Sequence, residues 1–186
     1  RRVINKGIDE DDILNAAENL LATDVQLVIL GTGDPYHETS FSELARRFPD
    51  KVSTLIGFDE ILAHQIEAGL DIFLMPSQFE PCGLNQMYSL IYGTVPIVHE
   101  VGGLADSVVD ASDTNLENGT ANGFSFWHFD ATVLYRQMRR AIDMYNDKPT
   151  WQQLMQNGMT RDWSWKHSAQ NYLSVYQQAL SFRANS

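Results

Sequence analysis

The sequence predicts an α/β fold in which helices cover both faces of a doubly wound parallel sheet. Five short runs rich in apolar and β-branched residues alternate with segments of helical periodicity. The runs are apolar throughout, which is typical of parallel strands that are buried on both faces. Right-handed crossovers through the intervening helices then give a Rossmann-like layer.

Each expected strand is a short apolar run that ends at a turn or loop. The first is Val25–Leu30, which Gly31 ends. The later runs are Val52–Ile56, Asp71–Met75, Val95–Val98 and Gly123–Trp127. A parallel sheet brings the carboxyl ends of its strands, and usually its ligand, to one edge. The expected loops at that edge are residues 31–35, 57–59, 77–84 and 99–104.

Helices are expected where apolar residues recur three or four positions apart. In the first such segment, Ile13, Ala16 and Leu20 share one face. In chain order, the expected helices span residues 12–21, 41–48, 59–68, 85–92, 104–109, 131–145, 150–157 and 165–180. The polar stretch Ala111–Asn122 is expected to be a surface loop with a turn at Asn118-Gly119.

The composition excludes several classes of function. Of the 186 residues, 44% are hydrophobic and 20% are charged, which indicates one globular domain and not a disordered chain. The net charge of −11 argues against binding to nucleic acid or to an anionic membrane surface. The longest uninterrupted apolar runs, such as Leu27–Leu30, are far shorter than the ~20 residues of a membrane-spanning helix.

Location and metal content follow from a few residue types. No secretory leader opens the sequence, and the single cysteine, Cys82, excludes an internal disulfide and a cysteine-rich zinc site. The histidines show no spacing typical of metal ligands. We therefore expect a cytoplasmic protein that uses no metal ion and no other cofactor.

The charges are distributed unevenly along the chain. No Lys or Arg occurs between Lys51 and Arg136, whereas the same stretch contains 11 Asp and Glu residues. A phosphate ester bound by this stretch would have to be held by backbone N–H groups and helix N-termini. Positively charged side chains that could neutralise the phosphate would come from the N-terminal residues Arg1, Arg2 and Lys6.

Residues 77–86, with the sequence SQFEPCGLNQ, are the segment most indicative of a binding site. The segment leaves an expected strand, crosses a Pro-Cys-Gly turn and enters a helix whose first N–H groups could hold an anion. Gly83 would let the backbone approach a ligand closely. Glu80 is placed where substrates bind, although a solvated loop carboxylate is the default interpretation. Cys82 fits a small buried residue better than a nucleophile, because no helper base is evident.

Residues 76–98, PSQFEPCGLNQMYSLIYGTVPIV, and residues 101–110, VGGLADSVVD, resemble the bacterial glycogen synthase and plant starch synthase family. The resemblance continues in the motifs GTGD (31–34), IGFDE (56–60) and DWSW (162–165), so it covers nearly the whole chain. It implies a retaining glucosyltransferase that transfers glucose from ADP-glucose to the non-reducing end of an α-1,4-glucan. Such enzymes have the GT-B fold, in which two Rossmann-like domains face each other across a cleft.

The resemblance also implies roles for individual residues. Arg1 and Lys6, five positions apart, match the Arg and Lys that clamp the donor diphosphate in the family. Glu80 would orient the donor glucose, and these three residues are the expected catalytic ones. Phe58 follows a strand-ending glycine and could stack on adenine, with a core aromatic as the alternative. The expected donor-binding residues are Gly33, Phe58, Cys82, Gly83, Leu84, Asn85, Gly102 and Gly103.

By the same resemblance, residues 1–186 would be the C-terminal, nucleotide-sugar-binding domain of the enzyme. The family strand that precedes Arg1 is absent from the sequence. It would lie near the middle of the sheet, and its absence would leave two neighbouring strands with unpaired edges. The terminal helix, residues 165–180, would pack toward an N-terminal domain that also binds the α-1,4-glucan acceptor. We therefore expect this chain alone to be inactive.

Three positions depart from the family pattern. Gln78 stands where the family usually has Arg, and His99-Glu100 stands where it has one or two basic residues. Tyr88, by contrast, agrees with the starch-type family, although other related retaining enzymes have a second Glu at that position. Two alternatives stay open: another GT-B enzyme, such as a sucrose-type or UDP-sugar transferase, and a non-catalytic module that binds a nucleotide or a glucan.

Overall fold

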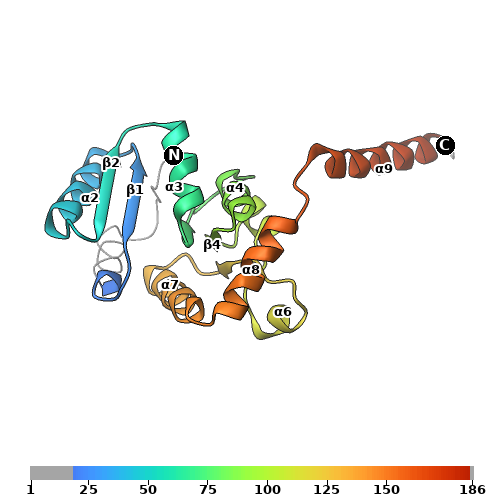
Figure 1. The fold of residues 1–186 in the computed structure, drawn as a ribbon. Helices are drawn as coiled ribbons and strands as arrows, with labels where there is room; N and C mark the ends of the chain where they lie inside the picture. Colours follow the sequence, from blue (N-terminus) through green and yellow to red (C-terminus); the bar gives the residue numbers. More distant parts are fainter. Residues whose placement is uncertain (1–18, 185–186) are drawn as a thin grey trace.

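The structure is a computed structural model that describes residues 19–184 of the chain (Figure 1). Its strands are β1 (Leu27–Gly31), β2 (Val52–Ile56), β3 (Ile72–Met75), β4 (Val95–His99) and β5 (Phe124–Phe126). Its helices are α2 (Pro35–Arg47), α3 (Glu60–Gly69), α4 (Asn85–Tyr92), α5 (Gly102–Ser107), α6 (Asp113–Glu117), α7 (Ala131–Tyr145), α8 (Lys148–Thr160) and α9 (Trp165–Ala184). All strand pairs are parallel, which confirms the predicted α/β class.

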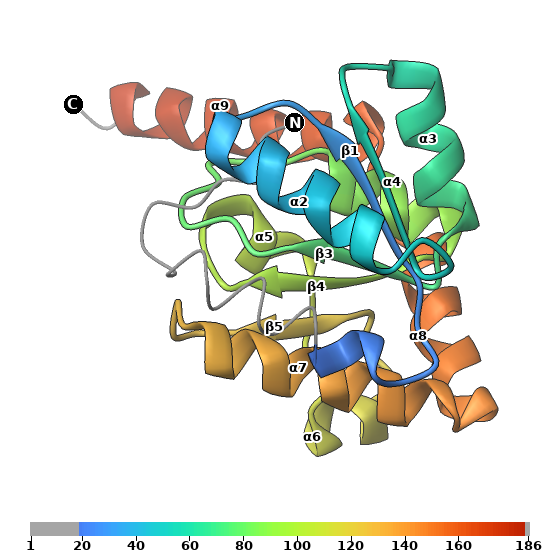
Figure 2. The same cartoon turned by 90° about the vertical axis from the view of Figure 1, so that its left-hand side faces the viewer.

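The five strands form two separate sheets. β1 pairs with β2, and β4 pairs with β3 on one side and with β5 on the other. Among the described residues no strand joins β1 to β3, so each of these two strands has an unpaired edge. Figure 1 shows the β1–β2 pair apart from β4, with α2 on its outer side, and in Figure 2, which looks onto that side, α2 lies in front.

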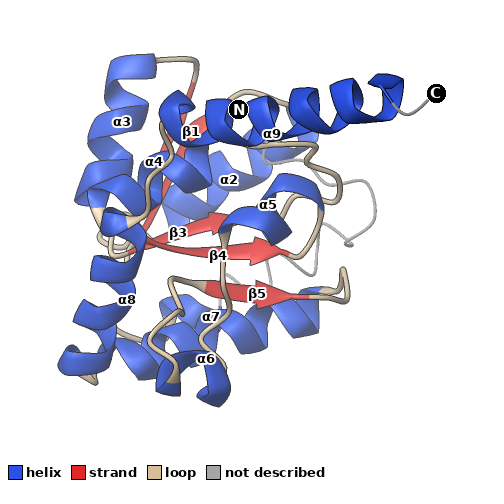
Figure 3. Ribbon diagram, turned by 90° about the vertical axis from the view of Figure 1, so that its right-hand side faces the viewer, coloured by secondary structure: helices blue, strands red, loops and turns tan. Residues whose placement is uncertain are grey.

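β4 is the most buried strand, because all five of its residues are buried. It has a hydrogen-bonded neighbour on each side, and α4, α5 and α8 contact it. Figure 3 shows β3, β4 and β5 side by side and pointing in the same direction. The main core joins β4 to β5, α7 and α8 through residues that include Ile97, Phe124, Leu134 and Leu154. The β1–β2 sheet has a smaller core of its own against α2.

Most helices begin where the sequence provides a capping side chain. An oxygen of the cap residue accepts a hydrogen bond from a backbone N–H group of the first turn. These caps are Asp34 for α2, Asp59 for α3, Ser112 for α6, Asp130 for α7 and Asp147 for α8. In contrast, the cap positions of α4 and α5 are the apolar residues Leu84 and Val101. Neither helix has a side-chain cap hydrogen bond within the described part of the chain.

The segment of residues 111–122 differs from the surface loop that the sequence predicts. Ser112 caps the short helix α6 inside it, and Asn122 is buried. Asn122 is satisfied there because its side-chain oxygen accepts a hydrogen bond from the Val109 N–H group, with an N···O distance of 2.7 Å. The expected turn at Asn118-Gly119 is present, and the glycine has a φ of 67°.

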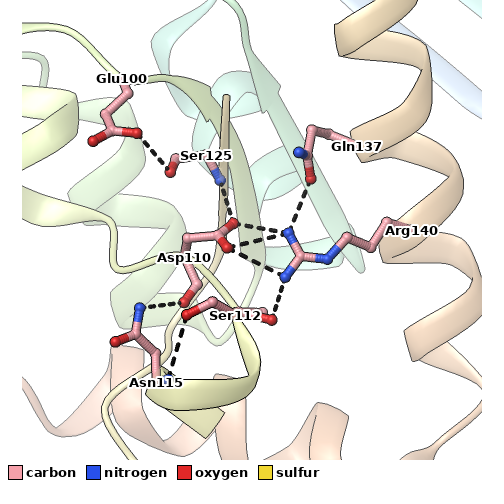
Figure 4. Close-up of polar contacts among 8 residues, drawn as sticks. Glu100, Asp110, Ser112, Asn115, Ser125, Gln137 and Arg140 are labelled. Carbon is pink, nitrogen blue, oxygen red and sulfur yellow. Dashed lines mark hydrogen bonds and ion pairs between the residues drawn. The ribbon is translucent and has the colours of Figure 1, made fainter. Parts of the chain in front are cut away.

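A polar network joins α7 to the segment that connects α5 with α6 (Figure 4). Arg140 Nη1 and Nη2 lie 3.0 and 3.2 Å from carboxylate oxygens of Asp110, and Nη2 also donates to the carbonyl group of Ala111. The same carboxylate accepts a hydrogen bond of 2.9 Å from the Ser125 N–H group in β5. The Asp110 carbonyl group accepts one of 2.8 Å from Asn115 Nδ2. The network therefore ties β5 and α7 to the carboxylate of Asp110 and α6 to its carbonyl group.

Candidate functional site

The loops that follow β3 and β4 lie against each other at the carboxyl ends of these strands. The β3–α4 loop comprises residues 76–84, and residues 100–101 lead from β4 into α5. The Gly103 N–H group of α5 donates a hydrogen bond of 3.2 Å to the carbonyl group of Pro81. In parallel α/β sheets this edge is where ligands bind.

Two consecutive glycines allow this contact. A Cβ atom on Gly102 would collide with the carbonyl oxygen of Glu80, and one on Gly103 would collide with the carbonyl oxygen of Cys82. Gly102 also has a φ of 45°, a conformation that favours glycine. The glycine pair is therefore required for α5 to pack directly on the backbone of the β3–α4 loop.

Gln86, in the first turn of α4, is fully buried. Its Nε2 atom lies 2.9 Å from the Cys82 carbonyl oxygen and 3.2 Å from both the Gly83 carbonyl oxygen and Ser107 Oγ of α5. Gly83 has a φ of 71°, and a Cβ atom there would collide with the Gln86 amide. Gln86 thus holds the Cys82-Gly83 turn against α4 and α5. Sequence reasoning missed this role; the available signal is an amide on the apolar face of a helix, where it needs a buried partner.

The start of α4 has the electrostatic character of an anion site. The first turns of α4 and α5 contain no acidic residue, whereas those of α2, α3 and α6 do. The N-terminal turn of a helix carries a partial positive charge of about half an elementary charge. Without a side-chain cap, that charge and the N–H groups at the start of α4 can stabilise an anion with no Lys or Arg nearby.

Glu80 and Cys82, the two polar residues of the Glu-Pro-Cys turn, differ in how far they are buried. Glu80 is half-buried, and its carboxylate has no hydrogen-bond or ion-pair partner within residues 19–184. Cys82 is exposed, so the expectation of a small buried residue is wrong. The reason is that Gly83, and not Cys82, is pressed against Gln86. Leu84 is also partly exposed at the start of α4.

Phe58 and Gly33 belong to the other sheet. Phe58 follows β2 and is 81% exposed, so the alternative of a core aromatic is wrong. Gly33 follows β1, and its N–H group donates a hydrogen bond of 2.8 Å to Glu38 Oε1 of α2. The two loops adjoin through a hydrogen bond of 3.1 Å from the Gly57 N–H group to the Gly31 carbonyl group. Arg1 and Lys6, the expected diphosphate ligands, lie outside the described residues.

Tyr88 packs against α3. Its ring lies 5.0 Å from the imidazole of His64 in α3, measured between ring centroids. The tyrosine therefore takes part in the packing of α4 on α3, where related enzymes have a carboxylate.

Other features of the described residues do not point to a second site. No group of three or more His, Cys, Asp or Glu among them could hold a metal ion. Within residues 19–184 we find no helix long and apolar enough to cross a membrane. The pKa of the Glu43 carboxyl is lowered because Arg46 donates hydrogen bonds of 2.6 and 2.8 Å to it. This exposed pair lies in the C-terminal half of α2, away from the carboxyl-end loops.

Comparison with known proteins gives a consistent family. Residues 1–158 match the model of the family described as "Glycosyl transferases group 1". A glycogen synthase from Cellvibrio japonicus is 54% identical over 181 residues, which are 97% of this chain and 37% of that protein. A glycogen synthase from Dechloromonas aromatica is 50% identical over 184 residues, or 99% of this chain and 38% of that protein. The chain thus spans little more than a third of the length of these relatives.

Solved structures support the same conclusion. The catalytic domain of Starch Synthase IV from Arabidopsis thaliana, bound to ADP and acarbose, superimposes with a TM-score of 0.72 at 29% sequence identity. The match covers 92% of this chain and 43% of that one. Sucrose-phosphate synthase from Thermosynechococcus elongatus has a TM-score of 0.63 at 21% identity, over 91% of this chain and 42% of that one, and shares the fold.

Proposed function

Since the chain belongs to the glycosyl transferases group 1 family, we propose that it is the donor-binding domain of a retaining glucosyltransferase that uses ADP-glucose. The longer enzyme would transfer glucose to the non-reducing end of an α-1,4-glucan. Support comes from relatives at 50% and 54% identity that are named glycogen synthase. The Starch Synthase IV structure, which was bound to ADP and acarbose, supports the choice of nucleotide.

The observation that carries the proposal is the start of α4, which has no side-chain cap and lies at the carboxyl end of β3. The donor diphosphate would bind there and accept hydrogen bonds from backbone N–H groups. When the bond between the glucosyl C1 and the diphosphate oxygen breaks, negative charge builds up on the leaving ADP. Donors that are already oriented toward this charge stabilise the transition state. Arg1 and Lys6 would add positive charge to the same diphosphate.

The remaining expected residues fit around this diphosphate position. Glu80, with no protein partner among the described residues, would accept hydrogen bonds from sugar hydroxyls and orient C1 for attack. Cys82, Gly83, Leu84 and Asn85 would line the diphosphate side of the β3–α4 loop. Gly102 and Gly103 would hold that loop against α5.

The adenosine end of the donor would lie toward the other sheet. Phe58 presents an exposed ring for stacking on adenine. The Gly33 N–H group already donates to Glu38, so Gly33 would contribute by letting the backbone approach the ligand, and not as a hydrogen-bond donor.

An N-terminal domain would complete the enzyme and bind the glucan acceptor. Helix α9 extends away from the rest of the molecule (Figure 1) and exposes an apolar set of side chains. These include Trp165, Tyr172, Leu173, Tyr176, Leu180 and Phe182. We propose that α9 packs on that domain and that a further strand fills the space between β1 and β3. We also place the enzyme in the cytoplasm, consistent with its single cysteine.

Titration with nucleotides tests the proposal directly. Isothermal calorimetry of the full-length enzyme with ADP and with UDP should give a clear preference for ADP. A transfer assay with ADP-glucose and a maltooligosaccharide should then produce a longer glucan. A preference for UDP would favour another GT-B transferase, and nucleotide binding without transfer would favour a non-catalytic module.

A further inference from the structure

His99 is a polar residue at the end of β4, and only 7% of its surface is exposed. Its two ring nitrogens face two backbone carbonyl groups. Nδ1 lies 2.9 Å from the oxygen of Ser77, and Nε2 lies 3.2 Å from the oxygen of Trp127. Because Ser77 follows β3 and Trp127 follows β5, one imidazole ring spans the carboxyl ends of all three strands.

Two phenylalanine rings fix the orientation of this imidazole. Phe126 stacks on it with a centroid distance of 5.4 Å, and the ring of Phe129 lies 5.0 Å away. A neutral imidazole donates through one nitrogen, whereas an imidazolium donates through both. A carbonyl oxygen can only accept, so the hydrogen bond to Ser77 is donated by an N–H group at Nδ1.

The bond to Ser77 is important because it lies beyond the last ladder pair of β3 with β4. His99 holds the start of the β3–α4 loop at Ser77, and Gly103 and Gln86 hold its end. Glu80 lies between these two attachments, three residues after Ser77. The position of the Glu80 backbone thus depends on both.

We propose that His99 is a positioning residue that holds Glu80 in place by fixing the carbonyl group of Ser77. The inference rests on the proposed function, because the position of Glu80 matters only if Glu80 contacts the donor sugar. The imidazole acts through the loop backbone and not on the ligand. A misplacement of about 1 Å in an orienting group can lower a reaction rate on the order of 100-fold, so one hydrogen bond at the base of the loop can affect kcat.

Two substitutions in the full-length enzyme separate the hydrogen bond from the packing. His99→Phe keeps an aromatic ring between Phe126 and Phe129 but cannot donate. His99→Gln retains a side-chain N–H group that can donate to Ser77. We expect His99→Phe to lower kcat by roughly 10- to 100-fold and His99→Gln to recover most of that loss. The dissociation constant for ADP should change by less than about threefold in both, because the diphosphate binds α4 and not Glu80.

A double-mutant cycle with Glu80→Ala distinguishes positioning from general stabilisation. If His99 acts through Glu80, adding His99→Phe to Glu80→Ala should lower kcat by less than about threefold further. Leu154→Ala, in the core at α8, is the control: it should lower the melting temperature and leave kcat nearly unchanged. If His99→Phe does not fold, the same cycle with His99→Leu, which also cannot donate to Ser77, decides.

The outcomes separate this inference from the proposed function. If Glu80→Ala leaves kcat unchanged, the proposed role of Glu80 is wrong and the inference about His99 is overturned with it. If Glu80→Ala lowers kcat but the loss from His99→Phe is additive to it, only the inference about His99 is overturned. A lack of recovery in His99→Gln would also overturn that inference alone.

Discussion

At the scale of single residues, the proposed donor contacts lie in two different carboxyl-end regions. Glu80 lies in the β3–α4 loop, whereas Phe58 lies at the end of β2 in the other sheet. The two side chains would therefore contact opposite ends of the donor. This separation allows the contributions of sugar and adenine contacts to be measured independently.

Phe58→Ala should weaken ADP affinity by about tenfold, since stacking of a base on an aromatic ring is worth about 1–3 kcal/mol. The ring is 81% exposed, so its removal should leave the melting temperature unchanged. Calorimetric titration with ADP measures the effect. Ile61→Ala, at an equally exposed apolar position on α3, is the control and should bind ADP normally. Unchanged affinity in Phe58→Ala would exclude the stacking role.

Glu80→Ala in the full-length enzyme should lower kcat on the order of 100-fold, because a group that orients the reacting carbon is lost. ADP affinity should stay within about threefold, since ADP lacks the glucose that Glu80 would hold. Steady-state kinetics combined with ADP titration checks both quantities. The assignment fails if ADP affinity falls strongly while kcat is retained.

The residue-level site could be predicted only in part from the sequence. The resemblance points to the glycine pair, and the structure shows that this pair packs on the β3–α4 loop. The ligand contacts of Glu80 and Phe58 stay predictions. The side-chain contacts of Gln86 and His99 could not be predicted, because their partners are carbonyl groups brought close by the fold. Cys82 was misjudged for the same reason: its exposure depends on which face of the turn is pressed against α4.

At the scale of elements, the contact between α5 and the β3–α4 loop depends on glycine. Gly103→Ala should destabilise the protein by about 1–3 kcal/mol, because its Cβ atom would collide with the Cys82 backbone. Urea denaturation measures this change. Gly69→Ala, at the end of α3 with no atom near the added Cβ, should be neutral or slightly stabilising. Equal stability of the two variants would contradict the packing argument.

Two neighbouring arginines of α7 provide a second test of element packing. Arg140→Met should lower the free energy of unfolding by about 1–3 kcal/mol, since it leaves a half-buried Asp110 carboxylate without its cation. Arg139→Met removes only the exposed pair with Asp143 and should cost less than about 0.5 kcal/mol. Chemical denaturation of both variants in the same buffer gives the comparison. A larger loss of stability in Arg139→Met than in Arg140→Met would show that the network does not tie α7 to β5.

Clear start and stop signals gave correct boundaries for some helices, but the helix expected at residues 41–48 begins at Pro35, directly after its cap Asp34. The bounds of α4 and α7 agree with the prediction, since Gly93 ends the first and Asp130 caps the second. Helix α6 was missed because its five residues are too few for a periodic pattern. The start of α5 at Gly102 was missed because glycines rarely begin a helix, and here packing on the loop outweighs propensity.

At the scale of the whole molecule, the 186-residue chain should bind ADP weakly and transfer no glucose by itself. Without a second domain, water is not excluded and no acceptor is held near C1. The net charge of −11 repels an anionic ligand, and added salt would screen this repulsion while weakening the Arg1 and Lys6 contacts. We therefore expect ADP affinity to vary little with salt. Turnover of a maltooligosaccharide by this chain would contradict the proposed division into domains.

The overall architecture was predictable from the alternation of elements, whereas the separation of the strands into two sheets could not be predicted from local patterns. Local apolar runs predict that every strand is buried, and this is confirmed for β4 but not for all of β1 and β2, because burial also depends on the order of the strands. β1 and β2 are accordingly more exposed than β4, which has neighbours on both sides.

The hydrogen bonds of Gln86 and the glycine pair have a practical consequence for protein engineering. Gln86 and Gly103 bind three segments to one another: the turn of the β3–α4 loop, the first turn of α4 and α5. These segments should therefore be exchanged together. A chimera that exchanged only residues 77–84 with another enzyme would bring a loop whose carbonyl groups no longer match Gly103 and Gln86. Exchange of donor preference between enzymes should therefore transplant residues 77–107 as one block.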